Sequence, residues 1–232
     1  MSKVKAIVVS HEHSDHITGV PGISKKYQIP VYITQATFKH SNIPVQEHLL
    51  RHFQSGERLI VGSILVQSFL KSHDAVDPHS FLVSYSNIHV GVFTDIGYTC
   101  KELSRYFPLC HAAFLESNYC DTMLENGNYP YHLKHRIRSN KGHLSNDQAA
   151  ELFTKFRGPG LSHLILSHLS KNNNTPEKVE NLFISIAGNT KITVASRYQE
   201  TPVFEVNAGN IPVIKLPPVR KKVQPSKQLS LF

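Results

Sequence analysis

The segment Ser10-His11-Glu12-His13-Ser14-Asp15-His16 decides the fold, because it gathers three histidines and an aspartate directly after the apolar run Ala6-Ile7-Val8-Val9. Side chains of extended backbone repeat with a period of two, so His11 and His13 should point to the same side. A turn after Ser14 would carry Asp15 and His16 to a neighbouring position. The pattern therefore predicts two metal ions close together, as two-metal hydrolases hold them.

Three further candidate ligands follow apolar stretches that predict strands. His73 comes after Ile64-Leu65-Val66, Asp95 after Val92-Phe93, and His168 after Leu164-Ile165-Leu166. Taken alone, a histidine or aspartate in such a place is more often a turn or capping residue. Their joint presence favours a site, because α/β folds collect functional groups at the carboxyl ends of strands.

Together these residues resemble the ligand motifs of the metallo-β-lactamase fold superfamily. The resemblance implies an α/β (α+β) fold, the metallo-β-lactamase-like αβ/βα sandwich. It also implies ligands for two ions, with His11, His13 and His73 on the first, Asp15, His16 and His168 on the second, and Asp95 bridging both.

Later segments carry a narrower resemblance, to the YycJ (or WalJ) group of bacterial metallo-β-lactamase-fold exonucleases, over about residues 1–206. These segments are Ser72–Pro78, Thr94–Tyr98, Leu115–Asn118, Asn128–Pro130, Arg136–Ser139 and Gly142–Asn146. The resemblance implies 5′-to-3′ hydrolysis of DNA, with a role in mismatch repair. Members of the group begin with a β-hairpin region that has no counterpart here, so we expect an N-terminally truncated chain that lacks these strands.

The predicted ligands are all nitrogen or oxygen donors, which suit two divalent ions such as Mn²⁺ or Zn²⁺ and argue against a closed thiolate site. Two such ions can activate a bridging hydroxide for attack on phosphorus, which makes Asp15 and Asp95 catalytic as well as ligating. His143 is a candidate to contact the scissile phosphate or to protonate the leaving oxygen. Glu116 is a candidate to orient a ligand or His143. For both residues, a purely structural hydrogen bond is the alternative.

The chain is basic, with 25 Lys and Arg against 17 Asp and Glu, a formal net charge of +8 and a pI of about 9.4. Part of the excess lies at Lys134, Arg136, Arg138 and Lys141, just ahead of His143. Such a segment predicts contacts with the phosphates of DNA. A solvated helix face is the alternative.

Residues 207–232 are rich in proline and lysine and predict a flexible basic tail. The tail ends in Gln228-Leu229-Ser230-Leu231-Phe232, which resembles the clamp-binding motif of bacterial replication and repair proteins. The resemblance implies a sliding-clamp partner that binds Gln228, Leu229, Leu231 and Phe232. A C-terminus that folds back onto the domain is the alternative.

The remaining composition favours one hydrolase domain in residues 1–206, with a cytoplasmic location. No apolar run has the length of a membrane span, and the N-terminus lacks a signal-peptide layout. Cys100, Cys110 and Cys120 have no metal-site spacing and are expected to be reduced. We predict strands at 4–10, 64–70, 80–86, 88–94, 111–117 and 161–167, and helices at 99–107, 145–156 and 176–186.

The leading functional prediction is a metal-dependent DNA exonuclease. The same metal centre could instead hydrolyse small esters, thioesters or lactones, or cleave RNA. A non-catalytic adaptor bound to the clamp is a third class. The basic segment and the tail motif favour DNA over small esters, and the complete ligand set argues against the adaptor.

Overall fold

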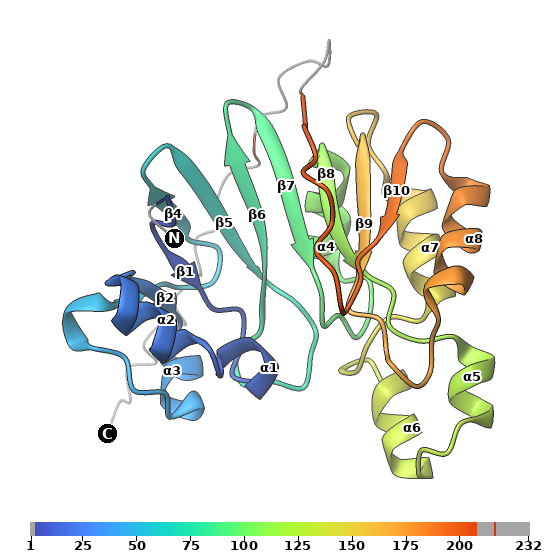
Figure 1. Ribbon diagram of the computed structural model, residues 1–232, viewed down its shortest axis with the longest axis horizontal. Helices are drawn as coiled ribbons and strands as arrows, with labels where there is room; N and C mark the ends of the chain where they lie inside the picture. Colours follow the sequence, from blue (N-terminus) through green and yellow to red (C-terminus); the bar gives the residue numbers. More distant parts are fainter. Residues whose placement is uncertain (1–2, 208–215, 217–232) are drawn as a thin grey trace, which may run out of the picture.

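Two β-sheets form the centre of the computed structural model, which describes residues 3–207 and Leu216 (Figure 1). The small sheet is parallel and consists of β1 (Ile7–Val8), β2 (Val31–Ile33) and β3 (Leu50–His52). The large sheet has the order β10-β9-β8-β7-β6-β5-β4. Its strands are β4 (Arg58–Val61), β5 (Ile64–Leu70), β6 (His79–Tyr85), β7 (Ile88–Phe93), β8 (Ala112–Glu116), β9 (His163–Ser167) and β10 (Lys191–Val194).

Helices cover the outer faces of both sheets. Apolar residues of α1 (Ser14–Ile17), α2 (Val20–Tyr27) and α3 (Gln35–Ser41) pack with the small sheet. Those of α4 (Lys101–Tyr106), α7 (Asn146–Phe156) and α8 (Pro176–Ile186) pack with the large one. Helices α5 (Asp121–Asn126) and α6 (Tyr131–Arg138) project beyond one end of the large sheet (Figure 1). Single 3₁₀ turns occur at Glu47–Leu49 and Phe107–Leu109.

The alternation of strand side chains explains this layering. In β2, Val31 and Ile33 face the helices of the small sheet, whereas Tyr32 packs toward the large sheet. In β6, Phe81 joins the cluster between the sheets, and Leu82 joins the core beneath α4, α7 and α8. Each sheet therefore buries both faces, one against the other sheet and one against helices. The predicted αβ/βα sandwich is confirmed.

Local signals in the sequence set the ends of the two longest helices. The Ser145 hydroxyl accepts a hydrogen bond from Gln148 N at 3.2 Å, and the Gln148 side chain accepts one from Ser145 N at 2.9 Å. This reciprocal capping box starts α7. Thr175 caps α8, whose first residue is Pro176. The predicted helices at 145–156 and 176–186 are thus confirmed within one residue.

Strand directions bring the candidate site to one edge of the large sheet. Strands β7, β8, β9 and β10 are parallel, and β5 shares their direction because β6 is antiparallel to both β5 and β7. The residues that follow β5, β7, β8, β9 and β10 therefore meet at the same edge. No helix within residues 3–207 is long and apolar enough to cross a membrane. The predicted clamp motif, Gln228 to Phe232, lies outside the described residues.

Candidate metal centre

Two of the predicted ligands occupy unusual backbone positions directly after their strands. Asp95 follows β7 with a φ of 55°, and His168 follows β9 with a φ of 58°. Few residues other than glycine adopt this left-handed region, although aspartate and histidine do so more often than most. Such a conformation costs about 1–3 kcal/mol and persists only where surrounding structure imposes it. At these two residues the left-handed backbone ends strands β7 and β9 next to the candidate site.

Three ring nitrogens converge in a first group of ligands. His13 Nδ1 lies 3.1 Å from His11 Nε2 and 3.3 Å from His73 Nε2. His73 Nδ1 faces the Gly142 carbonyl at 3.1 Å, so it carries the proton and leaves a lone pair on Nε2. Burial lowers the pKa of His11 to about 2 and that of His73 to about 4, so both rings are neutral at pH 7. The group is suited to bind a cation.

A second group consists of Asp15, His16 and His168, and Asp95 lies between the two groups. Asp15 Oδ2 is 3.5 Å from His16 Nε2 and 3.9 Å from His168 Nε2. The two carboxylate oxygens of Asp95 lie 3.2 Å from His16 Nε2 and from His168 Nε2 respectively, and Asp95 Oδ1 is 3.8 Å from His73 Nε2. The structure therefore brings together all seven residues that the sequence predicts as ligands.

Unsatisfied buried atoms give a direct test of whether a metal fits. His16 Nε2 and Asp95 Oδ2 are both buried, and neither makes a hydrogen bond of normal geometry within the described residues. Buried polar atoms are otherwise almost always satisfied. Among the described residues, four sets of potential ligand atoms lie within 4.8 Å of one another. Three consist only of predicted ligands, namely His11/His13/His73, His11/His16/Asp95 and Asp15/His16/His168, and the fourth is Asp95/Glu116/His143/His168. Divalent ions that accept nitrogen and oxygen ligands fit this arrangement.

Glu116, the last residue of β8, is hydrogen-bonded to two histidines of the site. Its fully buried carboxylate accepts hydrogen bonds from His168 Nδ1 at 2.8 Å and from His143 Nδ1 at 3.0 Å. Burial would raise the pKa of Glu116, but these two rings outweigh it and lower the pKa to about 2. Burial would likewise lower the pKa of His168, yet Asp15 and Glu116 raise it to about 10. A metal that binds His168 Nε2 must therefore replace a proton.

Lys71 is a buried lysine that was not among the predicted site residues. Its side chain is only 3% exposed, and its ammonium donates to Thr94 O at 2.8 Å and lies 3.6 Å from Asp95 Oδ2. Burial holds the pKa of Lys71 below its usual range. Burial would raise the pKa of Asp95, but His16 and Lys71 outweigh it and keep that carboxyl ionised. The sequence signal that could have identified Lys71 is its place between an apolar strand and a ligand motif.

The loop that carries His143 is fixed by close backbone contacts. His143 N donates to Ile137 O at 2.9 Å, and a Cβ on Gly142 would overlap with this carbonyl. Glycine is therefore required there. Asp74 N donates to Lys141 O at 3.0 Å, which ties the loop to the segment that contains His73. The loop thus holds His143 beside His73 and His168, with ring centroids 5.2 and 5.3 Å from its own.

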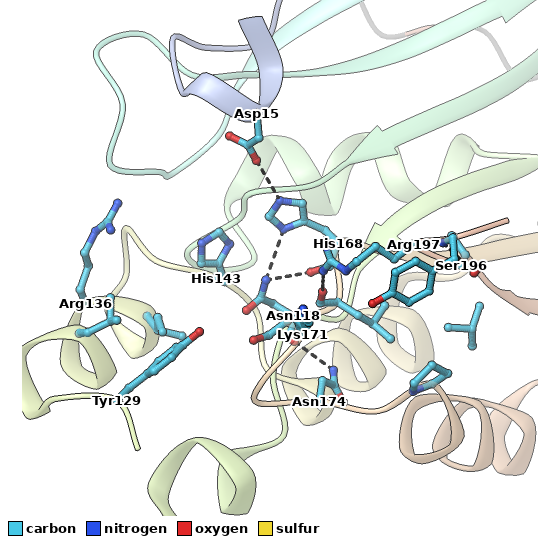
Figure 2. Close-up of a pocket in the computed structure, with 18 residues that line it drawn as sticks. Asp15, Asn118, Tyr129, Arg136, His143, His168, Lys171, Asn174, Ser196 and Arg197 are labelled. Atoms are coloured by element: carbon cyan, nitrogen blue, oxygen red, sulfur yellow. Dashed lines mark hydrogen bonds and ion pairs between the residues drawn. The ribbon is translucent and has the colours of Figure 1, made fainter. Parts of the chain in front are cut away.

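A pocket of about 840 Å³ opens beside these ligands (Figure 2). Asp15, His143 and His168 form part of its wall, and further lining comes from α6 and from the segment after β10. Several of its polar lining residues were not among the predicted site residues: Asn118, Lys171, Asn174, Ser196 and Arg197. Those after β10 follow the β-branched run Ile192-Thr193-Val194, the same strand-then-polar signal that revealed Asp95 and His168.

The four predicted DNA-binding residues are placed less favourably than expected. Arg136 lines the pocket, but its guanidinium is paired with Asp74. Arg138 is paired with Glu125 and Asp121, and Lys134 donates to the Glu125 carbonyl. Lys141 is exposed. Much of the charge of α6 is therefore used within the protein.

Comparisons with known proteins agree with this architecture. Residues 1–169 match the family described as "Beta-lactamase superfamily domain". The chain is 35% identical over 182 residues to exodeoxyribonuclease YycJ of Bacillus anthracis, covering 76% of this chain and 68% of that protein. It is 33% identical over 180 residues to exodeoxyribonuclease WalJ of Streptococcus pneumoniae, covering 74% and 66%. The chain thus spans about two thirds of the length of these curated relatives.

A solved structure supports the same fold at low sequence identity. The metallo-β-lactamase fold protein YhfI from Bacillus subtilis superimposes with a TM-score of 0.65 at 16% identity, covering 84% of this chain and 76% of that one. The predicted resemblance is therefore confirmed by a family match, by curated relatives and by a solved fold. The chain belongs to the metallo-β-lactamase fold superfamily and, within it, to the YycJ/WalJ family.

Proposed function

We propose that this protein is a metal-dependent 5′-to-3′ DNA exonuclease. The observation that carries the proposal is the position of Asp95, whose two oxygens lie 3.2 Å from ligands of the second group while Oδ1 lies 3.8 Å from His73 of the first. A carboxylate in such a place can bridge two cations. The relatives YycJ and WalJ are named exodeoxyribonucleases, and the pocket beside the centre contains lysine and arginine.

Two divalent ions, Mn²⁺ or Zn²⁺, would be held by the two groups and bridged by Asp95. The first group is His11, His13 and His73, and the second is Asp15, His16 and His168. When bound, the ions would supply Lewis-acid activation of water and charge neutralisation at phosphorus. Asp15, at the pocket wall, and Asp95 would fix the position at which a phosphate meets the ions.

His143 would handle the proton of the leaving group. Glu116 accepts from His143 Nδ1 at 3.0 Å and so fixes the ring. When the ring also carries a proton on Nε2, it would donate that proton to the leaving oxygen or in a hydrogen bond to a phosphate oxygen. Its side chain is 21% exposed and lines the pocket, so a substrate can reach it. Glu116 is fully buried and would act only by positioning His143 and His168.

The proposal is tested by incubating the Mn²⁺- or Zn²⁺-loaded protein with nicked duplex and single-stranded DNA labelled at either end. We expect shortening from the 5′ end, no cleavage in EDTA, and two metal ions per chain by elemental analysis. Asp95→Ala should abolish cleavage, whereas Asp147→Asn, an exposed change on α7, should not. Two bound ions without any DNA cleavage would refute the proposal and favour a small ester or thioester substrate.

The proposal extends to a sliding-clamp partner and a role in mismatch repair. The tail sequence Gln228-Leu229-Ser230-Leu231-Phe232 supports it, because a short apolar motif on a polar segment is a common way to dock onto a partner pocket. Such a tether would raise the local concentration of the nuclease on DNA. Deletion of residues 228–232 should abolish clamp binding in a pull-down and leave metal content and cleavage intact. Undiminished binding would refute this part.

A further inference from the structure

We infer that the pocket side formed by Lys171, Ser196, Arg197 and Tyr198 is a nucleotide subsite, which binds a phosphate that neighbours the scissile one and the base attached to it. The inference rests on the proposed nuclease function. It adds what the metal centre alone does not contain, namely residues that distinguish a nucleic acid strand from any other phosphodiester.

This side of the pocket lies next to the predicted metal ligands. Figure 2 places Tyr129 and Arg136 on one side of His143 and His168, and Ser196 and Arg197 on the other. A phosphodiester at the metal centre would therefore have pocket wall on both sides. A volume of about 840 Å³ lies within the range of roughly 300–1,000 Å³ of ligand pockets, which leaves room for a nucleotide beside the centre.

Charge distinguishes the two sides. Arg136 is paired with Asp74, whereas neither Lys171 nor Arg197 has an acidic partner among residues 3–207. Apart from Asp15, none of the described residues that line the pocket is acidic. The side after β10 therefore has unneutralised positive charge next to the metal ligands. A phosphate is the anion that a strand would present there.

Hydrogen bonds within the protein already hold the side with Arg197 in place before a ligand binds. Arg197 Nη2 donates to Leu169 O at 2.8 Å, which holds the guanidinium beside the loop that begins with His168 and leaves its other donors available. The Ser196 hydroxyl accepts hydrogen bonds from Tyr198 N at 3.1 Å and Gln199 N at 3.2 Å, which fixes the turn after β10. A donor already held in place loses less entropy when it binds a ligand.

The loop on which Lys171 lies rests on a buried amide network. Asn174 Nδ2 donates to Asn146 Oδ1 at 2.8 Å and to the carbonyls of Ser117 and Asn118 at 2.9 and 3.0 Å. Asn118 Nδ2 in turn donates to His168 O at 2.8 Å. These bonds attach the pocket floor to the same loop as the ligand His168, so a phosphate bound at this side has a defined distance from the metal centre.

An aromatic side chain completes the subsite. Tyr198 lines the pocket and is 80% exposed, so its ring is available to a ligand. Exposed aromatic rings beside cationic grooves stack on the bases of single strands. Lysine and arginine for the phosphate, together with tyrosine for the base, match a nucleotide better than they match a small ester.

The test compares two substrates of the Mn²⁺-loaded full chain, a single-stranded oligonucleotide and bis(p-nitrophenyl) phosphate, which has no neighbouring phosphate. For Lys171→Ala and Arg197→Ala, we expect kcat/KM for the oligonucleotide to fall roughly 10- to 150-fold, as loss of a charge-assisted hydrogen bond gives. Tyr198→Ala should cost roughly 5- to 150-fold. In each case kcat/KM for bis(p-nitrophenyl) phosphate should stay close to the wild-type value.

Salt dependence separates a phosphate contact from a structural effect. Each lost contact should make the slope of log(kcat/KM) against log[salt] shallower by about 0.7 for a single strand. Arg51→Ala is the matched control for Arg197, because Arg51 is also exposed and bonded to a backbone carbonyl, 2.7 Å from Leu50 O, but lies on β3 outside the pocket. Tyr85→Ala, 56% exposed at the end of β6, is the control for Tyr198.

Oligonucleotides with a 5′-phosphate or a 5′-hydroxyl identify which phosphate is bound. If the effect of Arg197→Ala disappears with the 5′-hydroxyl strand, the subsite binds a terminal phosphate, and if it persists, an internal one.

The inference is overturned if the wild type cleaves DNA but the pocket variants behave like their controls or lose activity on both substrates equally. Cleavage of bis(p-nitrophenyl) phosphate without cleavage of DNA would overturn the proposed function and the subsite with it. Since Lys171 is exposed and unpaired among the described residues, its variant stays informative even if Arg197→Ala does not fold.

Discussion

Replacement of Glu116 by glutamine gives the sharpest test of how the centre is built. The two shapes are nearly the same, but one carboxylate oxygen becomes an NH₂ group that donates instead of accepting. Glu116 Oε1 accepts from Leu144 N at 2.8 Å and from Ile96 N at 3.3 Å. Its Oε2 accepts from Asp95 N at 2.8 Å and from the two histidine rings. Every position of the new NH₂ group therefore faces at least one backbone N–H.

The size of the effect follows from counting those donors. An amide at the Oε1 position leaves two buried backbone N–H groups without an acceptor, a cost of about 2–6 kcal/mol. An amide at the Oε2 position leaves one such group, about 1–3 kcal/mol, and forces His143 and His168 to give up the proton on Nδ1, so that the proton remaining on each ring lies on Nε2. His168 Nε2 is then blocked for a metal. We therefore expect a stability loss of about 1–6 kcal/mol and roughly 10- to 100-fold weaker metal binding.

Urea unfolding in EDTA measures the first quantity, and competition with a chelator of known affinity measures the second. Glu125→Gln is the matched control, because Glu125 is an exposed glutamate whose carboxylate is paired with the exposed Arg138, and its replacement should change neither quantity. A Glu116→Gln protein with wild-type stability and wild-type metal affinity would refute the reasoning. Loss of stability with unchanged metal affinity would show that Glu116 supports the loop but does not orient His168.

Three further predictions concern Gly97 and Lys71 near the centre and His111 at the opposite end of β8. Gly97→Ala would push a Cβ into the carbonyl of Asn140 and should cost about 1–3 kcal/mol in urea unfolding, whereas Gly22→Ala, with open space around it, should cost nothing; equal stabilities would contradict this. Lys71→Met should destabilise the protein in EDTA by about 3–5 kcal/mol, because it removes the partner of the buried Asp95 carboxylate. Mn²⁺ should restore most of this loss of stability. An equal loss with and without Mn²⁺ would refute the prediction. Burial keeps the pKa of His111 below the ordinary 6.5, so near and below that pH the unfolded chain binds a proton at His111 more readily than the folded protein. The free energy of unfolding should therefore fall between pH 7 and 5, and it should fall less in His111→Asn. An identical fall in the two proteins would count against this prediction.

The parts of the site that the sequence predicted are those with a strand immediately before a ligand. Asp95, Glu116 and His168 could be found because a short apolar run that predicts a strand ends next to each of them. The small sheet was harder, since β2 and β3 have only three residues each and offer little periodicity. The capping signals of α7 and α8 were reliable because a cap is a local contact that does not depend on the rest of the fold.

What the sequence could not predict depends on contacts between distant segments. The left-handed backbone of Asp95 is imposed by Glu116, twenty-one residues later, which accepts the Asp95 N–H. The pairing of Arg136 with Asp74 spans sixty-two residues and partly neutralises an exposed side chain that the sequence predicts to contact DNA. No local pattern contains such information, because the charges of α6 look alike until their partners are known.

The charges of the centre are arranged so that the site keeps its shape before any metal binds. Asp95 and Glu116 are buried carboxylates, and the raised pKa of His168 together with the Lys71 ammonium places two cations against them. Two left-handed residues, Asp95 and His168, are held in this paired network, which stabilises their strained backbone. Metal binding then exchanges a proton of His168 for a cation and does not have to build the site. The affinity for metal should therefore increase with pH up to the pKa of His168, because the proton has to leave first.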